Sequence, residues 1–139
     1  MSESANIQMV KDAYAAFQQG DIDGVLRLVV DDVDWHGVKG AEGVAPQAGA
    51  RKGRAAVGGF FRQLAAATEF PHFEPREFVA QGDQVVVIGD YAATVKITGR
   101  SAVTDWVMVF TVRDGKISRF REWTDSAQLV RAYGAGVMA

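Results

Sequence analysis

The chain has 139 residues, of which 48% are hydrophobic and 23% are charged. This length predicts a single domain over residues 1–139, without a separate cofactor domain, and the apolar fraction is too high for a disordered chain. The 15 basic and 17 acidic residues give a formal charge of -2, so the positive excess of a nucleic-acid-binding protein is missing. The absence of cysteine excludes disulfides, thiolate metal sites and a cysteine nucleophile.

No segment of the sequence has the features of an export signal or a membrane span. The opening stretch MSESANIQMVKDAY lacks a basic region followed by an apolar run. No window approaches the roughly 18 to 20 apolar residues that a membrane-spanning helix needs. We therefore expect a cytoplasmic protein with neither a membrane nor a nucleic acid as its partner.

The first half of the chain has the pattern of helices. Apolar residues recur at spacings of three and four over residues 6–17, which is typical of an amphipathic helix, and Gly20 is expected to end it. Asp21 is placed to cap a second, short helix. A first short strand is expected over residues 33–36, and a third helix around residues 57–64.

The second half has the pattern of strands separated by turns. The expected strands cover residues 76–80, 84–97, 102–112 and 116–124. The turn Asp114-Gly115 favours a tight hairpin, so we expect an antiparallel meander with a bend at Gly89 in its longest strand. Helices followed by strands predict an α+β domain in which helices cover one face of a curved sheet and enclose an apolar interior.

Three stretches carry a resemblance to a known family: GDIDGVLRLVVDDVDWHG, RKGRAAVGGFFRQL and DWVMVFTVRDGKISRFREWTD. Over about residues 5 to 133 the chain resembles the SnoaL-like, ketosteroid isomerase-related branch of the nuclear transport factor 2-like superfamily. The resemblance implies a cone-shaped, cystatin-like α+β fold, in which a curved antiparallel sheet wraps around N-terminal helices, with a hydrophobic pocket and a homodimer. It does not imply one reaction, because this scaffold hosts isomerases, cyclases, dehydratases, epoxide hydrolases and binding modules.

The catalytic groups of the ketosteroid isomerases themselves are missing. In an alignment from Gly20, their aspartate base falls at Gly37 and their oxyanion tyrosine at Ala13, beside Tyr14. This departure disfavours steroid-type isomerisation. In the limonene-epoxide-hydrolase-like branch, the catalytic aspartate of the last strand falls at Glu122, but the R-x-D of the central strand is absent here.

Alternation along the last strand selects Glu122 as the first catalytic candidate. Phe120 and Glu122 share one face, whereas Arg119, Arg121 and Trp123 share the other. A face with two arginines is hard to bury, so Glu122 is expected to point inward, where desolvation would raise its pKa toward the range useful for acid-base chemistry. The alternative is that Glu122 pairs with a buried arginine or tyrosine and only orders the core.

Tyr91 and His36 are the further catalytic candidates. Tyr91 would donate a hydrogen bond to a ligand carbonyl, and His36 would relay a proton near the mouth of the pocket. The alternation of His36 with Trp35 favours the outer face, however. The two histidines, His36 and His72, lack metal-binding spacing, and no nucleotide-binding glycine motif is present, so neither a metal site nor a cofactor is expected.

The expected pocket lining is aromatic and thioether-rich. On one strand, alternation puts Trp106, Met108 and Phe110 on the same face, although such stripes are also typical of ordinary core packing. The residues expected to bind a ligand are Tyr14, Phe17, Trp35, Phe61, Trp106, Met108, Phe110 and Phe120.

Two further features are expected at the surface: a long glycine-rich segment and an apolar patch. The segment Gly37–Gly53 is rich in glycine and alanine and longer than an ordinary loop, so we expect a mobile lid with few packing partners. Val107, Val109 and Trp123 form an apolar patch on the outer face of the meander, which a homodimer would cover.

The sequence thus predicts a homodimeric protein with a pocket for a hydrophobic small molecule. Acid-base catalysis of the isomerase, cyclase, dehydratase or epoxide-hydrolase type is the first hypothesis. Ligand binding without turnover is the alternative. An interaction or adaptor module would be favoured if the protein's own side chains filled the cone.

Overall fold

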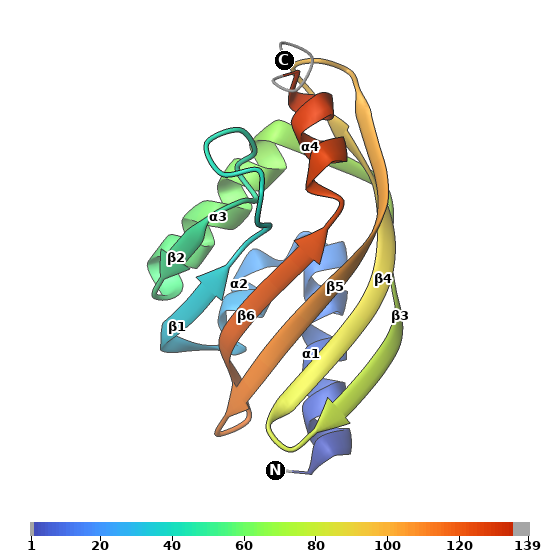
Figure 1. Ribbon diagram of the computed structural model, residues 1–139. Coiled ribbons are helices and arrows are strands. Elements are labelled where there is room, and N and C mark those ends of the chain that lie inside the picture. The colour runs from blue at the N-terminus through green and yellow to red at the C-terminus, as the bar shows by residue number, and fades with distance from the viewer. Residues whose placement is uncertain (1, 135–139) are drawn as a thin grey trace.

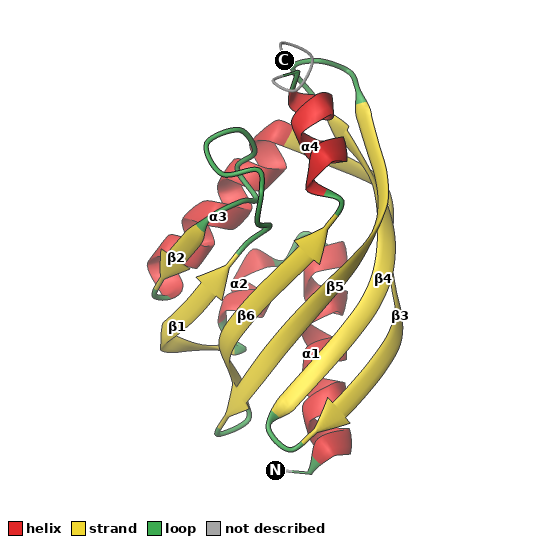
Figure 2. Ribbon diagram, in the orientation of Figure 1, coloured by secondary structure: helices red, strands yellow, loops and turns green. Residues whose placement is uncertain are grey.

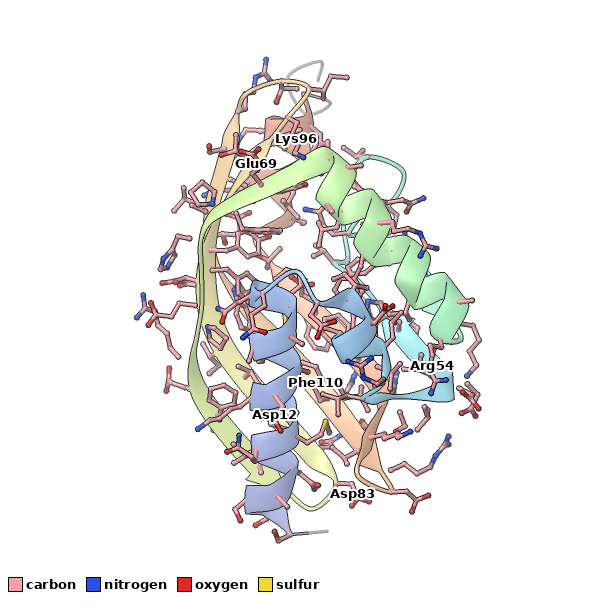
Figure 3. All side chains as sticks on the ribbon, turned by 180° about the vertical axis from the view of Figure 1, so that it is seen from behind. Asp12, Arg54, Glu69, Asp83, Lys96 and Phe110 are labelled. Carbon is pink, nitrogen blue, oxygen red and sulfur yellow. The ribbon has the colours of Figure 1, made fainter. Side chains whose placement is uncertain are left out.

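The computed structural model describes residues 2–134, in which one curved sheet carries helices on its inner side (Figure 1). The helices are α1 (Glu3–Gln18), α2 (Ile22–Leu26), α3 (Arg54–Ala67) and α4 (Ser126–Tyr133). The strands are β1 (Val29–His36), β2 (Ala50–Lys52), β3 (Thr68–Gln81), β4 (Gln84–Val95), β5 (Ser101–Arg113) and β6 (Lys116–Thr124). Figure 3, which views the molecule from behind, shows α1, α2 and α3 in front of the sheet. The α+β fold predicted from the sequence is confirmed.

The strand order is β2-β1-β6-β5-β4-β3, as the single layer of strands in Figure 2 shows. The long strands β3 to β6 form the expected antiparallel meander. The sheet is not purely antiparallel, however, because β1 joins it parallel to β6, with Trp35 opposite Phe120. Two strands far apart in the sequence therefore deliver their inner side chains to the same place.

Helices α1 and α2 begin after residues whose side chains cap them, Ser2 and Asp21. The Asp21 side chain accepts a hydrogen bond from the backbone N–H of Gly24 at 2.9 Å, as expected for the cap of α2. The chain passes Gly20 between α1 and α2 with a φ of 74°, which glycine adopts without a steric penalty. Within residues 2–134, no helix is both long and apolar enough to cross a membrane.

A β-bulge lies beside Gly89, but its extra residue belongs to β3 and not to β4, the strand in which the bend was expected. Pro75 pairs with Gly89 and Glu77 pairs with Ile88, so the extra residue, Arg76, lies in β3 opposite the glycine. A Cβ atom at Gly89 would collide with the carbonyl oxygen of Glu74 and with the indole of Trp106. The glycine is thus needed for close approach of a side chain and a neighbouring backbone.

The strand β3 is much longer than the predicted segment of residues 76–80. It begins at Thr68 and contains both Pro71 and Pro75. Proline interrupts a central strand, but β3 lies at the edge of the sheet, where the missing backbone donor is tolerated. The edge position therefore explains why proline did not end this strand.

The segment Gly37–Gly53 is better packed than predicted. Val38 and Ala41 are almost fully buried, and they share a second apolar cluster with Leu129 and Ala132 of α4. The expectation that this segment has few packing partners is wrong, because α4 follows β6 and lies against it. The segment nevertheless covers one end of the interior, since Gln47 lines the cavity described below.

Candidate functional site: an aromatic cavity around Glu122

A cavity lies between the sheet and the helices. It leaves about 80 Å³ open to the centres of water-sized molecules, and roughly 10 to 15 Å³ on this measure suffices for one water. The space is therefore large enough for several water molecules. Its lining residues are Ala13, Tyr14, Phe17, Val25, Trp35, Gln47, Phe60, Phe61, Leu64, Phe70, Phe73, Tyr91, Met108, Phe110, Ile117, Phe120 and Glu122.

Glu122 is the single acidic residue of this lining. It lies on the inner face of β6 directly opposite Met108 of β5, and only 7% of its surface is exposed. The inward orientation predicted from strand alternation is confirmed. Burial raises the pKa of Glu122 from 4.5 to about 8, so the carboxyl is mostly neutral at pH 7. Its carboxyl forms no ion pair or hydrogen bond with any residue in the described range 2–134, which counts against a purely structural pairing.

Two tyrosines share the cavity with Glu122. The Tyr14 hydroxyl donates to the Met108 thioether at 3.1 Å, and Met108 pairs in register with Glu122. Burial, together with the charge of Glu122 when ionised, raises the pKa of both Tyr14 and Tyr91 above 10. Both phenols therefore stay protonated near neutral pH and are available as hydrogen-bond donors. A thioether is a weak acceptor, so a ligand oxygen would compete with Met108 for the Tyr14 donor.

The apolar walls are made of flat aromatic faces. Trp35 stacks on Phe120 with ring centroids 4.0 Å apart and an angle of 22° between the planes. The Phe17 ring lies 5.9 Å from Phe61 and 5.2 Å from Phe73. Such walls favour a planar or cyclic apolar ligand, because offset and edge-on ring contacts add to the gain from burying apolar area.

Among residues 2–134, Gln47 is the only carboxamide of the lining. Its Oε1 accepts a hydrogen bond from the Tyr133 hydroxyl at 3.1 Å, and the same hydroxyl lies 3.0 Å from the Thr68 hydroxyl. The residue is 5% exposed. A side chain from the predicted lid is thus held in a fixed orientation at the cavity wall.

Most residues expected to bind a ligand line the cavity. They are Tyr14, Phe17, Trp35, Phe61, Met108, Phe110 and Phe120. Trp106 does not line it, which corrects that prediction. Its ring occupies the space above Gly89 and is covered by Phe73, whose ring centroid lies 5.2 Å away in a stacked arrangement. Trp106 is therefore a buried core residue that lies behind the side chains lining the cavity.

Of the further catalytic candidates, Tyr91 lies inside and His36 outside. Tyr91 is 3% exposed and belongs to the lining. The His36 ring lies 3.0 Å from the Asp34 carboxylate and is a third exposed, because Trp35 takes the inner face of β1. His36 therefore lies on the outer face, as its alternation with Trp35 indicated, and does not line the cavity; its role as a proton relay stays a prediction. Among residues 2–134, no cluster of three or more potential metal ligands occurs.

Eight residues of the lining were not among the predicted site residues: Ala13, Val25, Gln47, Phe60, Leu64, Phe70, Phe73 and Ile117. Phe60 follows the same helical spacing as Phe61, so the pattern of α3 already contained it. Phe70 and Phe73 lie in the proline-containing part of β3, where a register shift between Glu69 and His72 changes which side chains point inward. Nothing in the local sequence around Gln47 indicated its position.

Comparison with known proteins places this chain in a family. Residues 10–120 match the SnoaL-like domain. No curated protein matches the chain. Among solved structures, a nuclear transport factor 2-like protein from Burkholderia xenovorans is 38% identical, with a TM-score of 0.87, over 96% of this chain and 99% of that one. A second such protein, of unknown function, from Burkholderia pseudomallei is 30% identical, with a TM-score of 0.85, over 97% and 100%.

A third solved structure was obtained with a small molecule present. TerC, co-crystallised with polyporic acid, is 30% identical to this chain, with a TM-score of 0.81, and the match covers 93% of this chain and 98% of TerC. The family match spans most of the sequence, and the structural matches span nearly all of it. The chain therefore belongs to the SnoaL-like domain family of the nuclear transport factor 2-like superfamily.

Proposed function

We propose that the protein is an acid-base enzyme for a small, mainly apolar cyclic molecule that carries a carbonyl or a similar oxygen, with Glu122 as the general acid. The single observation behind this proposal is a neutral, unpaired carboxyl inside an aromatic cavity. Burying a carboxyl without a partner is unfavourable for the free energy of folding, so its presence there favours a functional role.

The chemistry follows from the protonation state. At neutral pH, Glu122 would donate its proton, or a strong hydrogen bond, to an oxygen of the substrate. Negative charge that develops on that oxygen would be stabilised by a donor held in a fixed position in an apolar cavity, where it has a larger effect than in solution. Tyr14 and Tyr91 would supply further donors from α1 and β4.

The comparison with TerC supports a small organic ligand. TerC was crystallised with polyporic acid, and nearly the whole of this chain aligns with it at 30% identity. The open space in the cavity counts against a protein that serves only as an adaptor, since its own side chains do not fill the interior completely.

Proton exchange on a simple ketone tests the proposal. We expect the protein to accelerate exchange of the protons beside the carbonyl of α-tetralone for deuterium in D₂O, followed by NMR. The proton at carbon would leave to water while Glu122 hydrogen-bonds the carbonyl oxygen. The variant Ala13→Phe, which puts a ring into the cavity without altering Glu122, should abolish the acceleration while circular dichroism shows an intact fold.

Ligand binding without turnover is the second candidate, and one observation favours it. The titratable neighbours of Glu122 are two tyrosines whose pKa values lie above 10, so the described lining holds no second group that ionises near neutral pH. Binding of α-tetralone, seen as a change in tryptophan fluorescence, without accelerated exchange on this or other cyclic ketones would favour this candidate.

We also propose a homodimer through the outer face of the sheet. Val107 and Val109 stand half-buried there beside Trp123, and the Arg121 guanidinium lies over the Trp123 ring at 5.6 Å. Val79 at the neighbouring edge is 57% exposed. A second copy of the same apolar face would cover this area by two-fold symmetry.

The variant Trp123→Arg is expected to dissociate the dimer, because it removes the largest apolar side chain and adds charge beside Arg121. We expect the dimer dissociation constant to rise by at least about thirtyfold, as for a central interface residue. Light scattering across a concentration series measures it. Ile97→Arg, in the exposed turn after β4, is the control. A wild-type mass of one chain at every concentration would refute the dimer.

A further inference from the structure

Gln47 is a buried carboxamide that faces an apolar cavity. It is 5% exposed, and its neighbours in the lining are mainly aromatic rings. Buried amide groups in proteins normally find hydrogen-bond partners for both the oxygen and the nitrogen, because an unmade hydrogen bond leaves a desolvation penalty of about 1 to 3 kcal/mol. The hydrogen-bond partners of the Gln47 side chain therefore show which of its two polar atoms remains available to a ligand.

The oxygen of this amide is engaged, and the nitrogen is not. The Tyr133 hydroxyl donates to Oε1 at 3.1 Å, which leaves the Tyr133 oxygen to accept from the Thr68 hydroxyl at 3.0 Å. The chain of donors thus runs from Thr68 through Tyr133 to Gln47. The Nε2 group forms no hydrogen bond with any residue between 2 and 134, so its two N–H donors have no protein partner there.

The backbone also fixes Gln47. Its carbonyl oxygen accepts from the Val38 N–H at 3.1 Å, and the Pro46 carbonyl accepts from Arg51 at 3.0 Å. Val38 follows the end of β1, and in that strand His36 pairs with Arg121, the residue before Glu122. The backbone of Gln47 is therefore held beside the end of β1, and β1 pairs there with the part of β6 that carries Glu122.

We infer that Gln47 is the residue that recognises the ligand: its Nε2 donates a hydrogen bond to a carbonyl or similar acceptor oxygen on an apolar ring, and Tyr133 is the positioning residue that keeps the amide in this orientation. This inference rests on the proposed function, because it assigns the ligand class of the same cavity. It adds a second donor, from a different segment of the chain, to the donor at Glu122.

The two donors, at Gln47 and at Glu122, favour ligands that carry acceptor oxygen atoms. A neutral amide N–H and a neutral carboxyl O–H both donate, so the preferred ligand presents acceptors and the remainder of its surface is apolar. A hydrocarbon of the same shape would fill the cavity but leave the amide nitrogen unpaired, which a site with buried polar groups disfavours. The ketone should therefore bind more tightly than the matching hydrocarbon.

The test compares two probes that differ by one oxygen, α-tetralone and tetralin, bound to the full chain and followed by tryptophan fluorescence. Gln47→Met removes the donor at similar volume, and Tyr133→Phe removes only the hydroxyl that orients the amide. Gln8→Met, an exposed glutamine of α1, is the matched control.

We expect Gln47→Met to weaken α-tetralone binding about threefold to tenfold, the value of one neutral hydrogen bond, and to change tetralin binding by less than about twofold. Tyr133→Phe should reduce the preference for the ketone in the same direction by about twofold to fivefold. Gln8→Met should leave both affinities unchanged. Loss of selectivity in Tyr133→Phe distinguishes positioning from a general effect on stability, which would weaken both probes.

Equal weakening of ketone and hydrocarbon by Gln47→Met, or no weakening of either, would overturn the inference, as would a failure of both probes to bind at millimolar concentration. Glu122→Gln separates this outcome from the proposed function. If Glu122→Gln keeps the full proton-exchange rate while Gln47→Met still removes ketone selectivity, the catalytic proposal fails and the recognition by Gln47 stands.

Discussion

Glu122→Gln is expected to lower the rate of protein-catalysed proton exchange on α-tetralone by roughly 10² to 10⁴, the range typical for loss of a general acid. The amide has nearly the shape of the protonated carboxyl and can still donate a hydrogen bond, so the dissociation constant for α-tetralone should stay within about tenfold. NMR of the deuterated product measures the rate, and fluorescence titration measures the affinity. A large fall in rate with nearly constant affinity identifies a group that acts in the transition state.

The pH dependence provides a second readout of the same prediction. Because the acid form of Glu122 is the active one, the exchange rate per molecule, corrected for exchange in buffer, should fall as the pH rises through about 8. Asp34→Asn, an exposed carboxylate on the outer face of β1, is the matched control and should change neither rate nor pH profile. A rate that is the same in Glu122→Gln and wild type would show that Glu122 is not the acid.

The free energy of unfolding should decrease as the pH rises from 4.5 to about 8, and Glu122 should account for the decrease. Its pKa is 4.5 in the unfolded chain and about 8 in the cavity, so in this interval the folded state holds more protons than the unfolded state. Stability from the neutral carboxyl is therefore fully present below 4.5 and is lost as the pH rises through the folded pKa. The total change is up to about 5 kcal/mol, since one pKa unit corresponds to about 1.36 kcal/mol.

Urea unfolding at several pH values measures this effect. In Glu122→Gln, which cannot ionise, the decrease should be absent or much smaller. The carboxyl of Asp90 does not obscure the comparison, because hydrogen bonds from Arg76 and His72 lower its pKa below 3.8 and its contribution changes at lower pH. Parallel pH profiles of wild type and Glu122→Gln would mean that Glu122 titrates like a surface carboxyl, and the binding-only function would then be favoured.

Local periodicity determined the features that depend on a single strand or helix. The inward position of Glu122 followed from the period of two in β6, because successive side chains of a strand point to opposite faces whatever the strand packs against. The inner stripe of α1, with Val10 and Tyr14, followed in the same way from the helical period. The resemblance to a family then implied the cone-shaped fold that brings these elements together.

Tertiary structure decided the features that depend on contacts between distant segments. Trp106 and Met108 have the same parity in β5, yet only Met108 reaches the cavity, because Gly89 on the neighbouring strand lets the Trp106 indole lie flat under Phe73. The edge position of β3 allowed Pro75 inside a strand, which sequence patterns alone would place outside one.

Gln47 is the clearest example of a residue whose position no local sequence pattern predicts. Its position depends on Tyr133, 86 residues away in the sequence, and on the backbone of Val38. Neither contact has a periodic signature in the sequence, because the segment Gly37–Gly53 belongs to no long helix or strand whose period could orient its side chains. The sequence by itself thus determined which face of β5 and of β6 points inward. Only the packing of α4 against this segment decided which polar group besides the carboxyl and the tyrosines lines the cavity.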